Sequence, residues 1–158
     1  MTAMTKRKDA TGAHAPPPAP LESKKAKRRS AALRWTESLV EGGFTPISNF
    51  FLEYACELRP EITPGEVLFI IHLMFFKWDE KMPRPAYKTV AKHIGIGDAQ
   101  ARKLARQLQK KNYLVRHMRR SQPNRFDLQP LFTALESLRD RIIAKQEAAQ
   151  AKRKPRRI

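Results

Sequence analysis

The chemistry that this sequence offers most clearly is the binding of a polyanion. Between Gly97 and Lys111, apolar residues recur at i, i+3, i+4 and i+7, which indicates an amphipathic helix, and the opposite side is basic. Guanidinium and ammonium groups bind phosphate oxygens and base edges, whereas an ordinary solvated helix, the alternative, usually intersperses Glu among its basic residues. The residues of this helix that we predict to contact nucleic acid are Asp98, Ala99, Arg102, Lys103, Arg106 and Lys110.

A second helix and a turn must position that basic side. The stretch 87–106 has the residue spacing of a helix-turn-helix. Ala91 is small where the two helices must cross closely, and Gly95 can take the positive φ that turns the chain out of the first helix. We therefore predict a first helix over 86–94. The lysines of this helix that we add to the contacts are Lys88 and Lys92.

A basic hairpin is predicted directly after the two helices. Asn112 can take the left-handed conformation that ends a helix, an extended segment follows at 113–118, and 125–128 can return as its partner strand. A plain surface hairpin is the alternative, but it does not account for basic residues that cluster without an acid before Asp127. The hairpin residues that we predict to contact nucleic acid are Arg116, Arg119, Arg120, Asn124 and Arg125.

The distribution of charge supports a polyanion-binding face. The chain carries a formal net charge of +17, and residues 84–125 hold twelve basic residues against one acid. The preceding segment, 44–83, holds three basic and six acidic residues. Because basicity that served only solubility would be spread evenly, this asymmetry indicates one face for nucleic acid. It also leaves the acidic, hydrophobic stretch 44–82 as a candidate surface for a protein partner.

The segment before the basic region is apolar and predicts the core of the domain. Pro46 can begin a helix that continues through Leu58, since apolar residues recur there every three or four positions. Thr63 and Glu66 have the spacing of a capping box ahead of the apolar run 67–78. That run predicts a central helix.

Two residues in this apolar segment have side chains that could react or bind a metal. His72 lies on an apolar helix, and we expect one of its ring nitrogens to be hydrogen-bonded, since no cluster of Cys, His or carboxylate groups accompanies it. Cys56 is the single cysteine of the sequence, and its apolar neighbours predict a buried thiol. We therefore predict no metal site, no cofactor and no catalytic residue.

The two ends of the chain differ from its middle. Residues 1–43 are rich in Ala, Pro and Lys, and we predict a disordered basic arm. After the hairpin, Pro130 begins a last helix, and 137–158 extends it into a basic tail. The apolar stripe of this helix fits either a homodimer seam or packing on the domain's own core, and we favour the dimer. The stripe consists of Leu131, Leu135, Leu138 and Ile142.

Three stretches together carry a resemblance to a known family. They are PAYKTVAKHIGIG (85–97), ARKLARQLQKKNYLVR (101–116) and NRFDLQPL (124–131). Over 44–136 the chain resembles the winged helix-turn-helix domains of bacterial, phage and plasmid regulators and replication initiators. The resemblance implies a mainly helical α+β fold with a β-hairpin wing, a helix in the major groove, and a wing along the backbone or minor groove.

Three functions agree with these observations. The first is double-stranded DNA binding by a transcriptional regulator. The second is a plasmid- or phage-type replication initiation module that recruits a protein through 44–82. The third is an architectural nucleic-acid-binding protein whose affinity depends steeply on salt and little on sequence.

Enzymatic activity and membrane association are not expected. Neither the Lys-Ser/Thr of a phosphate loop nor an argued Ser-His-Asp arrangement is present, and the longest apolar run, 67–76, is too short to cross a bilayer. We expect a cytoplasmic, nucleoid-associated bacterial protein.

Overall fold

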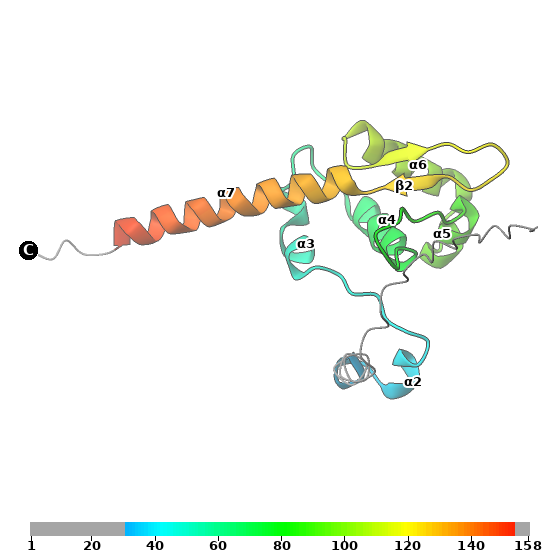
Figure 1. Ribbon diagram of the computed structural model, residues 1–158, viewed down its shortest axis with the longest axis horizontal. Helices are drawn as coiled ribbons and strands as arrows, with labels where there is room; N and C mark the ends of the chain where they lie inside the picture. Colours follow the sequence, from blue (N-terminus) through cyan, green and yellow to red (C-terminus); the bar gives the residue numbers. More distant parts are fainter. Residues whose placement is uncertain (1–30, 154–158) are drawn as a thin grey trace, which may run out of the picture. The chain divides into compact units, whose positions relative to one another are not determined.

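The computed structural model describes residues 31–153 of the chain (Figure 1). The chain divides into two compact units, Met1–Phe44 and Thr45–Ile158. Most of the predicted disordered arm, residues 1–30, and the end of the basic tail, residues 154–158, lie outside the described residues.

The first unit contains short helices where the sequence predicted disorder. Residues 31–34 are helical, and α2 spans Glu37–Val40. Thr36 precedes α2 in an extended conformation, and its hydroxyl accepts a hydrogen bond from the N–H of Leu39 at 3.4 Å. This N-cap satisfies a backbone donor locally, without a large core. The prediction of disorder through residue 43 is therefore wrong for these two helical segments.

The second unit is mainly helical and contains one small antiparallel sheet, which agrees with the predicted α+β class. Its elements are α3 (Asn49–Tyr54), the 3-10 helix η1 (Ala55–Glu57), α4 (Pro64–Phe75), α5 (Tyr87–Ile94), α6 (Asp98–Lys110), β1 (Val115–His117), β2 (Arg125–Asp127) and α7 (Gln129–Arg153).

The core of this unit lies where α4, α5 and α6 pack against one another. Phe69 and Leu73 of α4, Val90 of α5 and Leu108 of α6 have no exposed surface. Phe126 of β2 closes the core, with its ring edge-on to that of Phe69 at a centroid distance of 6.3 Å. The apolar run 67–78 therefore provides the central helix that the sequence predicted.

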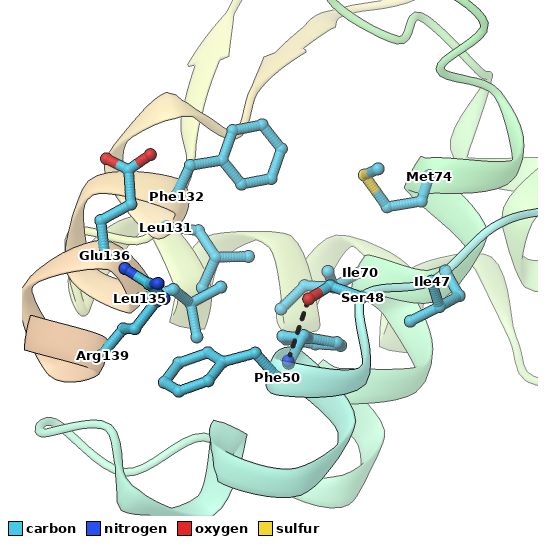
Figure 2. Close-up of a pocket in the computed structure, with 11 residues that line it drawn as sticks. Ile47, Ser48, Phe50, Ile70, Met74, Leu131, Phe132, Leu135, Glu136 and Arg139 are labelled. Atoms are coloured by element: carbon cyan, nitrogen blue, oxygen red, sulfur yellow. Dashed lines mark hydrogen bonds between the residues drawn. The ribbon is translucent and has the colours of Figure 1, made fainter. Parts of the chain in front are cut away.

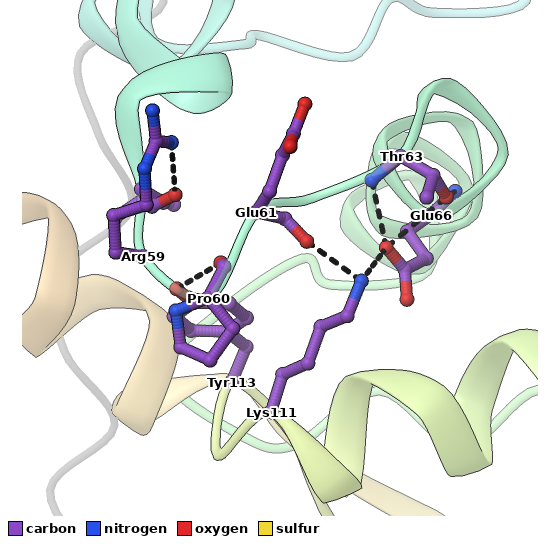
Figure 3. Close-up of polar contacts among 8 residues, drawn as sticks. Arg59, Pro60, Glu61, Thr63, Glu66, Lys111 and Tyr113 are labelled. Atoms are coloured by element: carbon purple, nitrogen blue, oxygen red, sulfur yellow. Dashed lines mark hydrogen bonds and ion pairs between the residues drawn. The ribbon is translucent and has the colours of Figure 1, made fainter.

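A set of polar contacts joins the start of α4 to the end of α6 (Figure 3). The hydroxyl of Thr63 accepts from the N–H of Glu66 at 3.3 Å, and Glu66 Oε2 accepts from the N–H of Thr63 at 2.7 Å, which confirms the capping box. Lys111 Nζ donates to the same Oε2 at 2.7 Å and to the carbonyl oxygen of Glu61 at 2.6 Å. The carboxylate of Glu66 is fully buried, so this ion pair joins two elements at a site with little water.

The region before α4 corrects two predictions. The helix does not begin at Pro46, because the hydroxyl of Ser48 accepts from the N–H of Phe51 and caps α3 two residues later. It also does not continue as an α-helix to Leu58, since the last turn tightens into η1. This change of helical twist leaves Cys56 exposed, and the prediction of a buried thiol is wrong.

The turn residues adopt the conformations that the sequence indicated. Gly95 ends α5 with φ of 80°, Gly97 precedes α6 in an extended conformation, and Asn112 has φ of 61° after α6. The hairpin strands are shorter than predicted, with Arg116 opposite Phe126 and His117 opposite Arg125.

A third extended segment lies beside β2. The N–H of Phe126 donates to the carbonyl oxygen of Pro83 at 2.9 Å, so the chain that enters α5 runs along the edge of the hairpin. Pro83 and Pro85 precede α5 and do not lie within it.

The apolar stripe of α7 packs on the core of its own unit, which is the alternative that we did not favour. Leu131 and Leu138 are buried, and Leu135 and Ile142 are half-buried against the core. Side chains from residue 144 to 152 are exposed, and α7 continues past the other elements of this unit (Figure 1). Within residues 31–153, no helix is both long and apolar enough to span a membrane.

An apolar groove of about 400 Å³ separates α7 from α3 and α4 (Figure 2). Leu131 and Phe132 line it from α7, and Ile70 and Met74 line it from α4. Phe50 of α3 covers one side. Segment 44–82, for which the sequence predicted a protein partner, thus contributes much of this groove, and that partner stays a prediction.

Candidate nucleic-acid interface

Helix α6 presents one apolar and one basic side. Ala101, Leu104, Ala105 and Leu108 are buried, and they hold the helix against α4 and α5. The basic residues between them point away from the core and are exposed; they are Arg102, Lys103, Arg106 and Lys110. The fold therefore places the predicted basic side of this helix in solvent, where a phosphate backbone could reach it.

The acidic residue at the start of α6 is paired within the helix. Asp98 Oδ2 accepts from Arg102 Nε at 2.9 Å, one turn along the helix. The guanidinium of Arg102 also lies over the ring of Tyr87, 4.9 Å from its centroid. A cation held by a carboxylate and an aromatic face keeps fewer rotamers than a free arginine. Asp98 therefore orients Arg102, which makes direct base contact by Asp98 unnecessary to explain its position.

The hydroxyl of Tyr87 links the two helices to the hairpin. It accepts from Arg116 Nη1 at 3.4 Å and from Asn124 Nδ2 at 3.5 Å. Arg116 also donates from Nε to Gln109 Oε1 of α6 at 2.7 Å. The start of α5, the basic side of α6 and both sides of the hairpin thus meet at one phenol, and they form a single surface.

The remaining predicted residues of the two helices lie around this surface. Lys88 and Lys92 of α5 are exposed, and Ala99 is exposed in the first turn of α6. Neither lysine has an ion-pair partner among the described residues. Their positive charge is therefore free to act on an approaching polyanion.

The other hairpin arginines do not join the contacts at Tyr87. Arg119 donates from Nε and Nη2 to the carbonyl oxygen of Pro123 at 3.0 and 2.8 Å, which closes the hairpin loop. Desolvation, followed by the nearby charges of Arg125 and Arg84, lowers the pKa of Arg119. Arg120 and Arg125 are exposed. The arginines of the hairpin are therefore divided between two places.

Sequence reasoning missed three residues that organise this region. Tyr87 and Gln109 hold Arg102 and Arg116, and Arg84 lies close enough to lower the pKa of Arg119. Arg84 was visible in the charge count, but nothing in the local pattern placed it beside the hairpin. The position of Tyr87 at the first turn of an otherwise polar helix face was a signal that could have been used.

The histidine and the acidic groups do not form a site among the described residues. His72 Nδ1 lies 2.8 Å from the carbonyl oxygen of Leu68, which confirms the expected satisfied ring nitrogen. Within residues 31–153, no three His, Cys, Asp or Glu side chains are grouped as metal ligands would be.

A search of solved structures places this fold beside a bacterial protein. The match is the N-terminal domain of the DnaD protein from Geobacillus kaustophilus HTA426, with a TM-score of 0.50 and 18% sequence identity. The aligned region covers 82% of this chain and 96% of the DnaD domain. At this identity the likeness is one of fold. No protein-family model matches the sequence, and no curated protein matches it.

Proposed function

We propose that this chain binds double-stranded DNA, with α6 in the major groove and the β1–β2 hairpin acting as a wing. The observation that carries the proposal is the continuous basic surface around Tyr87, on which α5, α6 and the hairpin meet. A single α-helix fits the major groove of B-DNA, and arginine is its commonest reader of guanine.

Arg102 and Arg106 are the residues to which we assign base contact. Arg102 is oriented by Asp98 and Tyr87, so less rotamer entropy is lost when it binds a base edge. Arg106 lies one turn further along the same exposed side of α6. Lys88, Lys92, Lys103 and Lys110 are assigned to phosphates, since an ammonium group acts as a point charge without a fixed fork.

Among the processes that use such a module, we favour replication initiation over transcriptional regulation. The support is the fold likeness to the DnaD N-terminal domain, because DnaD is a replication initiation protein. Binding without catalysis is sufficient for either role, and a DNA partner would place the protein at a bacterial nucleoid or plasmid.

The test is in vitro selection of the full chain on a random duplex library, in the presence of competitor DNA at near-physiological salt. We expect one compact enriched motif. Arg106→Ala should weaken binding to the selected site about tenfold, and binding to random duplex about twofold. Arg141→Ala, which removes the same exposed charge from α7, is the matched control and should weaken both only slightly.

Two results would contradict this assignment. Equal losses on selected and random duplexes for Arg106→Ala would remove α6 from base recognition. Tight, salt-sensitive binding without any enriched motif would instead support the architectural alternative. The replication role is tested separately, by asking whether an origin-less plasmid that carries the selected motif is maintained only when this chain is supplied.

A further inference from the structure

The hairpin has a second face, which points away from α6. Successive residues of a strand alternate between the two faces of a sheet. Phe126 is fully buried and Arg116 lies opposite it, so both belong to the inner face. His117 and Arg125, which form the next pair, therefore belong to the outer face.

The segment that enters α5 extends this outer face. Pro83 runs beside β2 through the bond from Phe126 N–H to its carbonyl oxygen, and both Pro83 and Pro85 are buried. Arg84 lies between them and is exposed, so it belongs to the same side as Arg125. Both arginines line an open hollow of about 730 Å³ at this edge of the fold.

Three guanidinium groups gather on this face without a compensating partner. Arg84 and Arg125 lie near enough to Arg119 to lower its pKa, after the effect of desolvation. Among residues 31–153, none of the three forms an ion pair. Like charges held together in this way repel one another, and a bound anion would relieve that repulsion.

The acidic groups near the hollow are largely committed elsewhere. Asp79 accepts from the backbone N–H of Lys81 at 2.8 Å, and its other oxygen lies 3.9 Å from Lys81 Nζ. Asp127 accepts from the N–H of Gln129 at the start of α7, at 2.8 Å. Glu80 also lines the hollow, is exposed, and forms no ion pair among the described residues.

An aromatic side chain stands at the rim of the same hollow. Trp78 is 78% exposed and lines the hollow together with Met82, Arg84 and Arg125. A large indole that packs on so little protein surface is available for stacking. Proteins that bind single-stranded nucleic acid combine this pair of features, a basic surface along the backbone and an aromatic ring under a base.

We propose that this outer face, formed by Trp78, Arg84, Arg119 and Arg125, binds an unpaired DNA strand. The arginines contact its phosphates and Trp78 stacks on one base. The site lies on the opposite face of the hairpin from Arg116, and it does not depend on the proposed duplex contact of α6. A chain with both surfaces holds a duplex and an adjacent melted strand at the same time.

The first experiment uses the full chain with Trp35→Phe, in which Trp78 is the single tryptophan. Addition of a twenty-nucleotide oligothymidylate should quench the fluorescence of Trp78, because a stacked base contacts the indole directly. Trp78→Ala should weaken binding of this oligonucleotide about tenfold, and Trp78→Phe by no more than about threefold, since phenylalanine retains a stacking face. Unchanged fluorescence at saturation would overturn the stacking role and the site with it.

The second experiment removes the charges. Arg84→Ala with Arg125→Ala should weaken oligothymidylate binding at least about tenfold and reduce its salt dependence by about one and a half phosphates' worth of slope. Arg141→Ala with Lys145→Ala, on the exposed part of α7, removes the same charge and is the matched control. A loss no greater than that of the control would overturn the proposal, and so would an equal loss on duplex DNA.

These results separate the two proposals. Arg106→Ala with Lys110→Ala should weaken duplex binding and leave oligothymidylate binding within about twofold. If the helix variant leaves duplex binding intact while the sheet variants still weaken oligothymidylate binding, the duplex assignment fails and the single-strand site stands. All of the exchanged side chains are exposed, so circular dichroism should show the same fold in every variant.

Discussion

Replacement of Lys111 by methionine would remove one partner of the buried ion pair between α6 and α4. Lys111 Nζ donates to Glu66 Oε2 at 2.7 Å, and the side chain of Glu66 is fully buried while that of Lys111 is 23% exposed. Lys111→Met keeps the aliphatic packing of the side chain but leaves a carboxylate without its cation. Thr63 would still donate to that carboxylate from its N–H and its hydroxyl.

The expected loss follows from this geometry. Removing one partner of a fully buried pair costs about 3–5 kcal/mol, mostly through the uncompensated charge that remains. Partial exposure of Lys111 and the two bonds from Thr63 reduce this, and we expect a loss of about 2–4 kcal/mol in the free energy of unfolding. Domains of this size are stabilised by about 5–15 kcal/mol, so the change is a large fraction of the total.

Urea unfolding, followed by circular dichroism at neutral pH, measures this difference. The midpoint should fall while the m-value stays constant, since the variant exposes the same surface on unfolding. Lys81→Met removes an exposed pair with Asp79 and should change stability by no more than about 0.5 kcal/mol. If Lys111→Met lost no more than this control, the buried pair would not stabilise the fold as we have reasoned.

Three further variants test the region around the interface. Asp98→Asn frees Arg102 and should weaken binding to the selected duplex about fivefold with little change on random duplex, as measured by anisotropy; an unchanged affinity ratio would contradict the orienting role. Gly95→Ala forces a Cβ into φ of 80° and should lower stability by about 1–2 kcal/mol in urea, whereas no loss would show that the turn relaxes. Burial raises the pKa of Tyr113, so the folded state keeps the phenol proton that the unfolded chain loses above pH of about 10. This stability is lost as pH rises through the folded pKa, and Tyr113→Phe should flatten the fall in unfolding free energy above pH 10; an unchanged slope would refute the assignment.

Local patterns in the sequence predicted the features that depend on neighbouring residues. The capping box of Thr63 and Glu66, the left-handed conformations of Gly95 and Asn112, and the bounds of α6 were all correct. Each of these rests on hydrogen bonds or side-chain periodicity within about one helical turn. Such interactions are set by the order of residues alone.

The errors came from places where a local pattern had two outcomes. The apolar spacing of 46–58 fits a continuous helix, but Ser48 caps α3 late and η1 turns Cys56 outward. The stripe of α7 fits both a dimer and its own core, and in the structure it packs on that core. Periodicity shows that a face is apolar and does not show what covers it.

The sequence by itself determined that this chain has a strongly basic segment, a helix-turn-helix spacing and an apolar central helix, because charge and periodicity are properties of the chain. Only the tertiary structure decided which basic residues act together. Tyr87 meets Arg116 across 29 positions, and Lys111 meets Glu66 across 45. The division of the arginines between an inner face, at Tyr87, and an outer face, beside Trp78, follows from the register of two short strands and from the segment at Pro83 that pairs with them. Contacts at such separations depend on how the whole core packs, and no local rule supplies them.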